Sequence, residues 1–237
     1  MNFLQLCQRA ALETGTSGSL LTTANQVGSL NRIITWVNQA WYELQTLRDD
    51  WGFMRSSGLV GGGASFTTVA GTAYYPLGSG AGTCGIAAAN FTKWDVETFR
   101  AYLTSVGTNN EVYLDPIAYD TWRDAYMYGA MRTVQTRPVA VAIGPNKEVC
   151  LGPPPNALYT ITADYFIAPT QMSSDSDTPT GLPARFHMMI VYKAMQYYAG
   201  YEAAPEVMDR GMAGYAALLG ELEAQYLPGM SFAGALA

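Results

Sequence analysis

The sequence contains a single histidine, His187, and any catalytic triad would have to use it as the base. The usual zinc and non-haem iron sites also need more imidazole than one residue supplies. His187 follows Arg185 and opens a strongly apolar stretch, which favours a residue at a helix start whose ring nitrogens bond to the backbone. We therefore expect neither a triad nor a histidine metal centre.

Paired carboxylates are the next group that could act on a substrate. A glycosidase needs two of them facing each other across a cleft, and the candidate pairs are Asp49/Asp50, Asp120/Asp124 and Glu221/Glu223. Asp120 and Asp124 stand beside Trp122 and Tyr126, an aromatic group that could hold a sugar. Subunit contact or local packing is the favoured interpretation of this cluster.

Two segments imitate ligand-binding loops. Asp175-Ser-Asp177 resembles the start of a calcium loop, but Thr180 and Phe186 occupy the positions where an EF-hand needs Gly and Glu. The stretch 173–179 is therefore interpreted as a polar linker. The glycine-rich stretches 61–63 and 78–82 lack the Lys-Ser/Thr of a phosphate-binding loop. No metal and no cofactor is expected, and the chain is not expected to be an enzyme.

The cysteines and the N-terminus indicate where the chain is made. Cys7, Cys84 and Cys150 are odd in number and far apart, which favours a reduced cytosolic origin without a zinc site. The first residues lack the basic start and apolar run of a signal peptide, and no stretch is long and apolar enough to span a membrane. We expect synthesis in the cytoplasm and no membrane partner.

Composition points toward an assembly subunit. Charged residues make up 14% of the 237 residues against roughly 25% in an average soluble protein, while 16 Tyr and 5 Trp favour buried contacts. The net charge is −6 and the 13 basic residues are scattered, so specific nucleic-acid binding is not expected.

The elements that would position these residues are helical at both ends of the chain. A short helix is expected near residues 4–11, closed by Gly15, and a helix of about twenty residues over 27–47, with Asn25 or Ser29 as its cap. An apolar helix follows over 187–201. The last helix opens at Pro205, with an apolar seam at Met208, Met212, Tyr215, Leu219, Leu222 and Tyr226.

The middle of the chain is rich in Gly, Thr, Ser and aromatic residues. Residues 66–75 predict a hairpin, 115–128 a short helix or an irregular aromatic segment, and 138–143, 149–151 and 158–167 three strands of an antiparallel meander. The fold class is therefore α+β: a helical bundle from 1–57 and 170–226, an inserted β-rich antiparallel region over 58–169, and a C-terminal tail over 227–237.

The chain ends resemble head-to-tail adaptor (connector or neck) proteins of tailed bacteriophages. The resemblance is carried by residues 3–9, 33–41 and 48–55, then by 182–187 and 192–205, and covers roughly half of the chain. It is weaker across the β-rich region.

This resemblance implies a virion structural protein at the head–tail interface, made in the cytoplasm of the bacterial host. Similar adaptors form a twelve-subunit homo-oligomeric ring under the portal, with a β-rich part that faces the tail or nozzle protein. Their C-terminal segments often grip the portal. The corresponding portal-binding residues here would be Tyr226, Leu227, Pro228, Met230, Phe232 and Leu236.

Charge and helix spacing extend this expectation. A ring of chains that each carry −6 would repel DNA phosphates, so the genome would pass through during ejection without specific binding. The residues expected in the bundle core or in subunit packing are Ile33, Val37, Trp41, Met195, Tyr198, Met212, Tyr215, Leu219 and Leu222.

Two alternatives stay open at this point. A tail tube or tail-completion subunit would need a dominant β-sandwich instead of helical ends. A glycan-binding or glycan-cleaving virion protein would use Trp122, Tyr126 and the neighbouring carboxylates.

Overall fold

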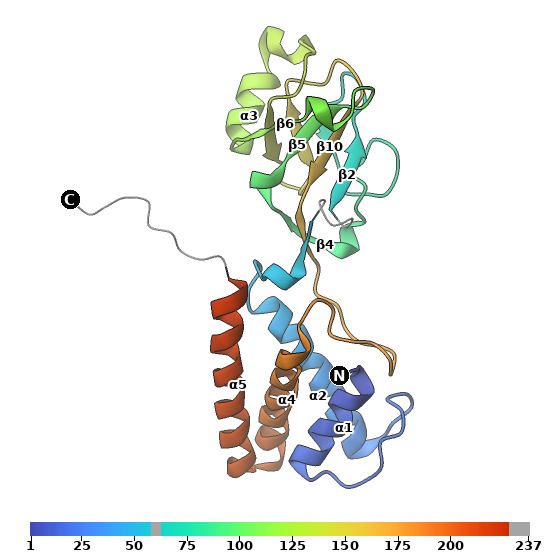
Figure 1. Ribbon diagram of the computed structural model, residues 1–237, viewed down its shortest axis with the longest axis vertical. Coiled ribbons are helices and arrows are strands. Elements are labelled where there is room, and N and C mark those ends of the chain that lie inside the picture. The colour runs from blue at the N-terminus through green and yellow to red at the C-terminus, as the bar shows by residue number, and fades with distance from the viewer. Residues whose placement is uncertain (58–62, 228–237) are drawn as a thin grey trace, which may run out of the picture. The chain divides into compact units, whose positions relative to one another are not determined.

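A computed structural model describes residues 1–57 and 63–227 of the chain. These residues form two compact units, which we call the helical unit (1–54 together with the chain from residue 169) and the β unit (55–168). Figure 1 shows helices drawn from both chain ends and a β-rich middle between them in sequence. The α+β fold class is confirmed.

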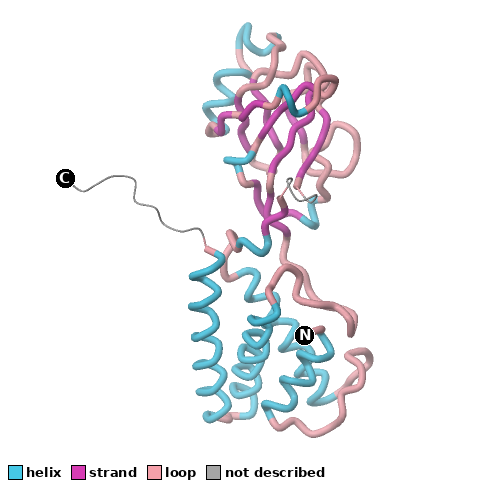
Figure 2. The backbone as a smooth tube through the Cα atoms, in the orientation of Figure 1, coloured by secondary structure: helices cyan, strands magenta, loops and turns pink. Residues whose placement is uncertain are grey.

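The helical unit is built around one central helix. Its helices are α1 (Phe3–Thr14), α2 (Gly28–Thr46), α4 (His187–Glu202) and α5 (Pro205–Tyr226). Helix α4 packs against each of the other three, and Figures 1 and 2 show it between α5 and the α1–α2 pair. Its burial on several sides matches its apolar sequence.

Two helix ends follow the predicted signals, and the start of α1 has a cap that was not predicted. Asn2 caps α1, because its side chain accepts the Gln5 N–H and the Gln5 side chain returns to the Asn2 N–H. Gly15 ends α1 in the left-handed conformation, and Pro205 occupies the first turn of α5. The expected cap of α2 is wrong: Val27 precedes the helix, and no side chain caps it.

The stretch 173–179 is part of the helical unit and not a free linker, which corrects the sequence interpretation. Its backbone carbonyls at Asp177 and Asp175 accept hydrogen bonds from Phe3 N and Leu4 N, at 2.7 and 3.3 Å. These N–H groups belong to the first turn of α1, where no helical acceptor exists. The segment therefore completes α1 with backbone atoms that come from the other end of the chain.

Helices α4 and α5 approach closely at two glycines. A side chain at Gly211 would meet the Tyr192 carbonyl at 2.9 Å, and one at Gly214 would meet the Tyr192 ring at 2.7 Å. The predicted seam is wrong at Met212, which is 56% exposed, because Gly211 faces α4 in its place. The contact therefore depends on the absence of side chains at two positions.

The β unit contains three small sheets, one large core cluster and a smaller cluster around Trp122. The strands are β1 (Arg55–Ser56), β2 (Ala64–Thr67), β3 (Tyr74–Tyr75), β4 (Phe91–Trp94), β5 (Arg100–Leu103), β6 (Val112–Tyr113), β7 (Asp115–Pro116), β8 (Ala140–Ile143), β9 (Val149–Gly152), β10 (Tyr159–Ala163) and β11 (Tyr165–Ile167). Their orders are β1-β11-β4, β2-β10-β5-β6 and β3-β9-β8-β7. Most pairs are antiparallel, and β7 pairs with β8 in parallel. Helix α3 (Tyr119–Tyr126) confirms the short helix predicted within 115–128.

The predicted hairpin over 66–75 is wrong. Strand β2 pairs with β10 and β3 pairs with β9, so the two strands belong to different sheets. The intervening turn is closed by a side chain: the Tyr75 hydroxyl accepts the Val69 N–H at 3.0 Å and donates to the Thr72 carbonyl at 2.8 Å. These backbone groups are therefore satisfied without a ladder between the strands.

The predicted meander is half correct. Strands β8 and β9 form its antiparallel pair, but the third strand leaves the sheet. The connection contains Pro153, Pro154 and Pro155, which have no N–H to donate to a ladder. The predicted third strand is also divided in two at Asp164, into β10 and β11. The buried side chains are odd-numbered in β10 (Ile161 and Ala163) and even-numbered in β11 (Phe166). The expected alternation therefore changes phase within the stretch.

Candidate functional site

His187 is held by the chain and is not presented to a substrate. It is buried at the start of α4, its Nδ1 lies 2.7 Å from the Met1 amino group, and its Nε2 lies 3.0 Å from the Leu182 carbonyl. Because the ammonium can only donate, Nδ1 accepts and Nε2–H donates to Leu182. Burial lowers the pKa of His187, so the neutral ring is favoured. The histidine therefore joins two segments of the helical unit.

The aromatic–carboxylate cluster on α3 is a packing feature. Trp122 has no exposed surface and meets Tyr74 edge-on at 5.1 Å and Tyr119 in a stack at 5.8 Å. A sugar could not stack on a ring in this position. The carboxylates of Asp120 and Asp124 lie 3.3 and 3.4 Å from the Arg123 guanidinium, and both carboxylates are exposed to solvent. Of the two favoured interpretations, local packing is confirmed for Trp122, whose ring is not open to a sugar, and subunit contact through the exposed carboxylates stays a prediction.

The described part of the chain offers no other centre of the types considered from the sequence. Its His, Cys, Asp and Glu residues form no group that could hold a metal ion. None of the described helices is long and apolar enough to cross a membrane. Burial raises the pKa of Cys7 and Cys150 to about 12, so both thiols stay protonated near neutral pH. Contact surfaces are therefore the features of the described residues that can carry function.

The residues expected in bundle core or subunit packing fall into two groups. Ile33, Val37 and Trp41 on α2, Met195 on α4 and Leu222 on α5 are buried in the core of the helical unit. Tyr198, Tyr215 and Leu219 pack against the same core and stay partly exposed. Met212 alone of the nine lies on the solvent side, so a core role is wrong for it and subunit packing stays a prediction.

The first two of the predicted portal-binding residues, Tyr226 and Leu227, pack on the helical unit. Tyr226 ends α5, and its ring meets Phe53 and Phe186 edge-on at 6.0 and 6.3 Å. Leu227 also packs on the core. Pro228, Met230, Phe232 and Leu236 lie outside the described residues. The two described members of the set therefore belong to the packing of the helical unit itself.

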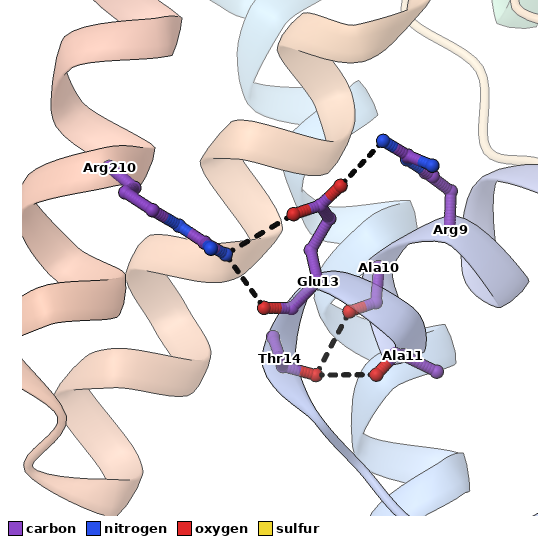
Figure 3. A network of polar contacts seen from close by, with 6 residues as sticks. All are labelled: Arg9, Ala10, Ala11, Glu13, Thr14 and Arg210. Atoms are coloured by element: carbon purple, nitrogen blue, oxygen red, sulfur yellow. Dashed lines mark hydrogen bonds and ion pairs between the residues drawn. The ribbon is translucent and has the colours of Figure 1, made fainter.

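Ion pairs fasten α5 to the helical unit at both ends of the helix. Figure 3 shows the Arg210 guanidinium on the Glu13 carbonyl at 2.8 Å and on its carboxylate at 3.2 Å, while Arg9 holds the other carboxylate oxygen at 2.6 Å. Toward the other end of α5, Glu223 lies 2.7 Å from Arg48. Together with the close approach of Gly211 and Gly214 to α4, these ion pairs set the face that α5 turns outward.

Between Arg210 and Glu221 that outward face carries no charged residue. We call it the α5 outer face; its exposed residues are Met212, Ala213, Ala216, Ala217, Gly220 and Ala224. They fall on one side of a helix with 100° between successive residues. The exposed residues of α2 are also uncharged, and they are Gly28, Ser29, Asn31, Thr35, Gln39, Tyr42 and Thr46. Uncharged outer faces of this kind are easier to bury against protein than charged ones.

Sequence reasoning missed the α5 outer face because it followed the apolar seam of large side chains. The signal that could have found it is the run from Gly211 to Gly220, which consists of small or apolar residues without a charged one. A helix that carries no charge on any side is predicted to be buried both against its own unit and against a partner.

Comparison with known proteins agrees with contact as the role of these surfaces. The sequence matches the family described as SU10 adaptor protein over residues 1–231, which include both units. The chain therefore belongs to the SU10 adaptor protein family. No curated protein matches the sequence. The family confirms the resemblance to phage adaptors and places the chain among structural proteins that associate with other phage structural proteins in the virion.

Proposed function

We propose that this protein is a head-to-tail adaptor that forms a ring, of twelve subunits by analogy with similar adaptors, between the portal and the tail of a phage particle. The ring would form part of the conduit for DNA ejection. The observation that carries the proposal is the family match, which runs through the helical unit and the β unit alike.

Charge supports the conduit. The helical unit has six basic and eleven acidic residues, a net charge of −5, against −1 for the β unit with seven and eight. Negative charge repeated around a ring repels DNA phosphates and prevents the genome from adhering during passage. The β unit would meet the tail or nozzle protein.

Attachment to the portal would use the chain beyond Leu227. Tyr226 and Leu227 are anchored on the helical unit, so a segment that follows them starts from a defined position. Met230, Phe232 and Leu236 are apolar, and no charged side chain follows Glu223. Such a segment suits an apolar groove on a partner.

The direct test is co-sedimentation of the protein with the portal encoded in the same genome, followed by negative-stain imaging. We expect a ring on one end of the portal, whose symmetry gives the subunit count. Absence of binding to an intact portal would contradict the portal role and favour a more distal tail protein.

Removing residues 228–237 should abolish sedimentation with the portal and leave the helical unit folded. The truncation begins at Pro228 because Tyr226 and Leu227 contribute to the core. A full-length variant with Met230, Phe232 and Leu236 changed to serine is the control for chain length, and it should fail in the same way. Portal binding by either variant would show that this segment is not the grip.

Ala216→Glu should prevent ring formation on the portal, because a buried, unpaired carboxylate in the α5 outer face costs about 3 kcal/mol or more at each subunit contact. Gln225→Glu is the matched control: it adds the same charge to the same helix, on an exposed position away from that face. Negative-stain imaging and circular dichroism measure the two effects. Rings of normal appearance with Ala216→Glu would exclude the α5 outer face as a subunit contact.

A further inference from the structure

The β unit contains a cavity that is open to solvent. Its volume is about 400 Å³, and three stretches of chain line it: the turn before β3, the end of α3 with the residues after it, and the proline turn after β9. We call it the arginine cavity. Its lining residues are Gly71, Ala73, Tyr74, Arg123, Met127, Tyr128, Arg132 and Pro154.

The walls of the arginine cavity are held in place by backbone hydrogen bonds. Gly71 N donates to the Pro155 carbonyl at 2.8 Å, and Leu151 N donates to the Ala73 carbonyl at 2.8 Å. Gly71 has a φ of +77°, and a side chain there would meet Gln135 at 2.9 Å. The cavity is therefore formed before any ligand arrives, which lowers the entropy lost on binding.

The charged lining of the arginine cavity is all of one sign. Arg123 and Arg132 both line it, and no carboxylate does. Arg123 is partly neutralised by Asp120 and Asp124 at the surface. Arg132 has no hydrogen bond or ion pair with any residue that the structure describes. Its charge acts on the Tyr74 hydroxyl, where it opposes burial and the more weakly acting Glu148 carboxylate, both of which raise the pKa of Tyr74. An unpaired guanidinium beside an aromatic ring favours an anionic ligand.

The rim of the cavity is apolar and exposed. Tyr128 is 60% exposed and Tyr74 is 41% exposed, and both residues line the cavity. Tyr, Met and Arg are the residue types enriched in the centres of protein interfaces, and this rim has all three within a short stretch of chain. A partner that covers the rim would bury apolar surface around its own anionic group.

We propose that the arginine cavity binds a protein segment that presents a carboxylate beside an apolar side chain. The carboxylate would enter between Arg123 and Arg132, and the apolar neighbour would pack on Met127 and Tyr128. Assignment of that segment to a tail-side protein rests on the proposed function, whereas the chemistry of the ligand rests on the cavity alone.

A carboxylate suits this cavity better than the phosphates of a nucleic acid. Asp120 and Asp124 stand beside Arg123 and would repel a polyanion that runs along the surface. Ala73, Met127 and Pro154, which line the cavity beside the arginines, offer no side-chain donors for a sugar–phosphate backbone. One compact anion flanked by apolar groups matches both the charge and the rim.

The test is a titration of the full-length protein with methyl-labelled methionine, followed by NMR. Met127 lines the cavity and reports on binding, and Met212 in the helical unit is the internal control. The probes are acetyl-Gly-Leu-Glu-Leu-Gly-amide, the same peptide with Gln in place of Glu, and a thymidine pentanucleotide. We expect the Glu peptide to move the Met127 signal in the millimolar range and the Gln peptide to bind about tenfold or more weakly.

Arg132 variants make the test specific. Arg132→Gln should remove the response to the Glu peptide, and Arg132→Lys should retain part of it because the charge stays while the planar fork is lost. Arg9→Gln is the matched control, since Arg9 pairs with Glu13 in the helical unit. Equal binding of both peptides, a full response in Arg132→Gln, no response of the unmodified protein, or stronger binding of the oligonucleotide would each overturn the proposal.

Portal co-sedimentation of the same samples separates this proposal from the function proposed above. Arg132→Gln should sediment with the portal as the unmodified protein does. A silent Met127 signal together with normal portal binding overturns the cavity proposal alone. A normal peptide response without portal binding overturns the adaptor position alone.

Discussion

Gly181→Ala should lower the free energy of unfolding of the helical unit by about 3 kcal/mol or more. Gly181 has a φ of +76°, which costs an alanine about 1–2 kcal/mol. The added methyl group would also overlap the backbone carbonyl of Phe53. A backbone oxygen cannot swing aside as a side-chain tip can, so the chain around Phe53 has to move. Urea unfolding followed by the helical circular dichroism signal measures the loss.

Gly15→Ala is the matched control for this substitution. Gly15 lies in the same unit with a φ of +66°, and nothing lies within 4 Å of the place where its side chain would stand. It should therefore show the cost of the backbone conformation alone, about 1 kcal/mol. Equal losses at the two glycines would show that contact with Phe53 is unimportant.

Trp51→Ala should destabilise the helical unit by about 4 kcal/mol, the second large effect that we expect. Trp51 has no exposed surface and stacks on Phe53 at 5.5 Å. Its indole N–H donates to the Leu44 carbonyl at 2.9 Å, close to the end of α2. Carbonyls in the last turn of a helix have no partner within that helix. The side chain therefore fills the core and caps α2.

Trp51→Phe separates the two roles of this residue. It keeps most of the apolar volume and leaves the Leu44 carbonyl without its donor, so we expect a loss of about 1.5 kcal/mol. Trp36→Phe is the control, because Trp36 is only partly buried and should cost less than about 1 kcal/mol. Denaturant unfolding of the three variants gives the comparison. A Trp51→Phe protein as stable as the unmodified one would contradict the capping role.

The helices could be predicted from the sequence because their signals are local. Gly15 ends α1, Pro205 starts α5, and the apolar repeat of α2 lies within its own residues. The pairing of strands could not be predicted in this way. Neighbours such as β2 and β3 separate because Tyr75 closes the turn between them, and this bond is visible only once the side chain is placed. Sheet partners are set by contacts that are distant in sequence.

The same difference between local signals and contacts distant in sequence applies to the candidate surfaces. Ile33, Val37 and Trp41 were expected in the core because an apolar repeat marks the buried face of a helix. Met212 was misplaced because Gly211 allows α4 to approach, which turns the neighbouring residue outward. The arginine cavity could not be predicted, since Gly71, Arg132 and Pro154 come from three separate stretches. The spacing of residues in a sequence does not show that these three stretches lie together in the fold.

The assembly of one unit from both chain ends sets an order of events on the ribosome. The β unit is continuous, so its core can close as soon as residue 168 has left the exit tunnel. Helices α1 and α2 are made earlier but pack on α4, which starts at residue 187. At bacterial rates of synthesis, α4 is completed on the order of ten seconds after α2. The apolar side chains of Ile33, Val37 and Trp41 stay exposed during this time. The nascent chain is thus most open to aggregation and proteolysis while its first helices are complete and its last ones are not yet translated.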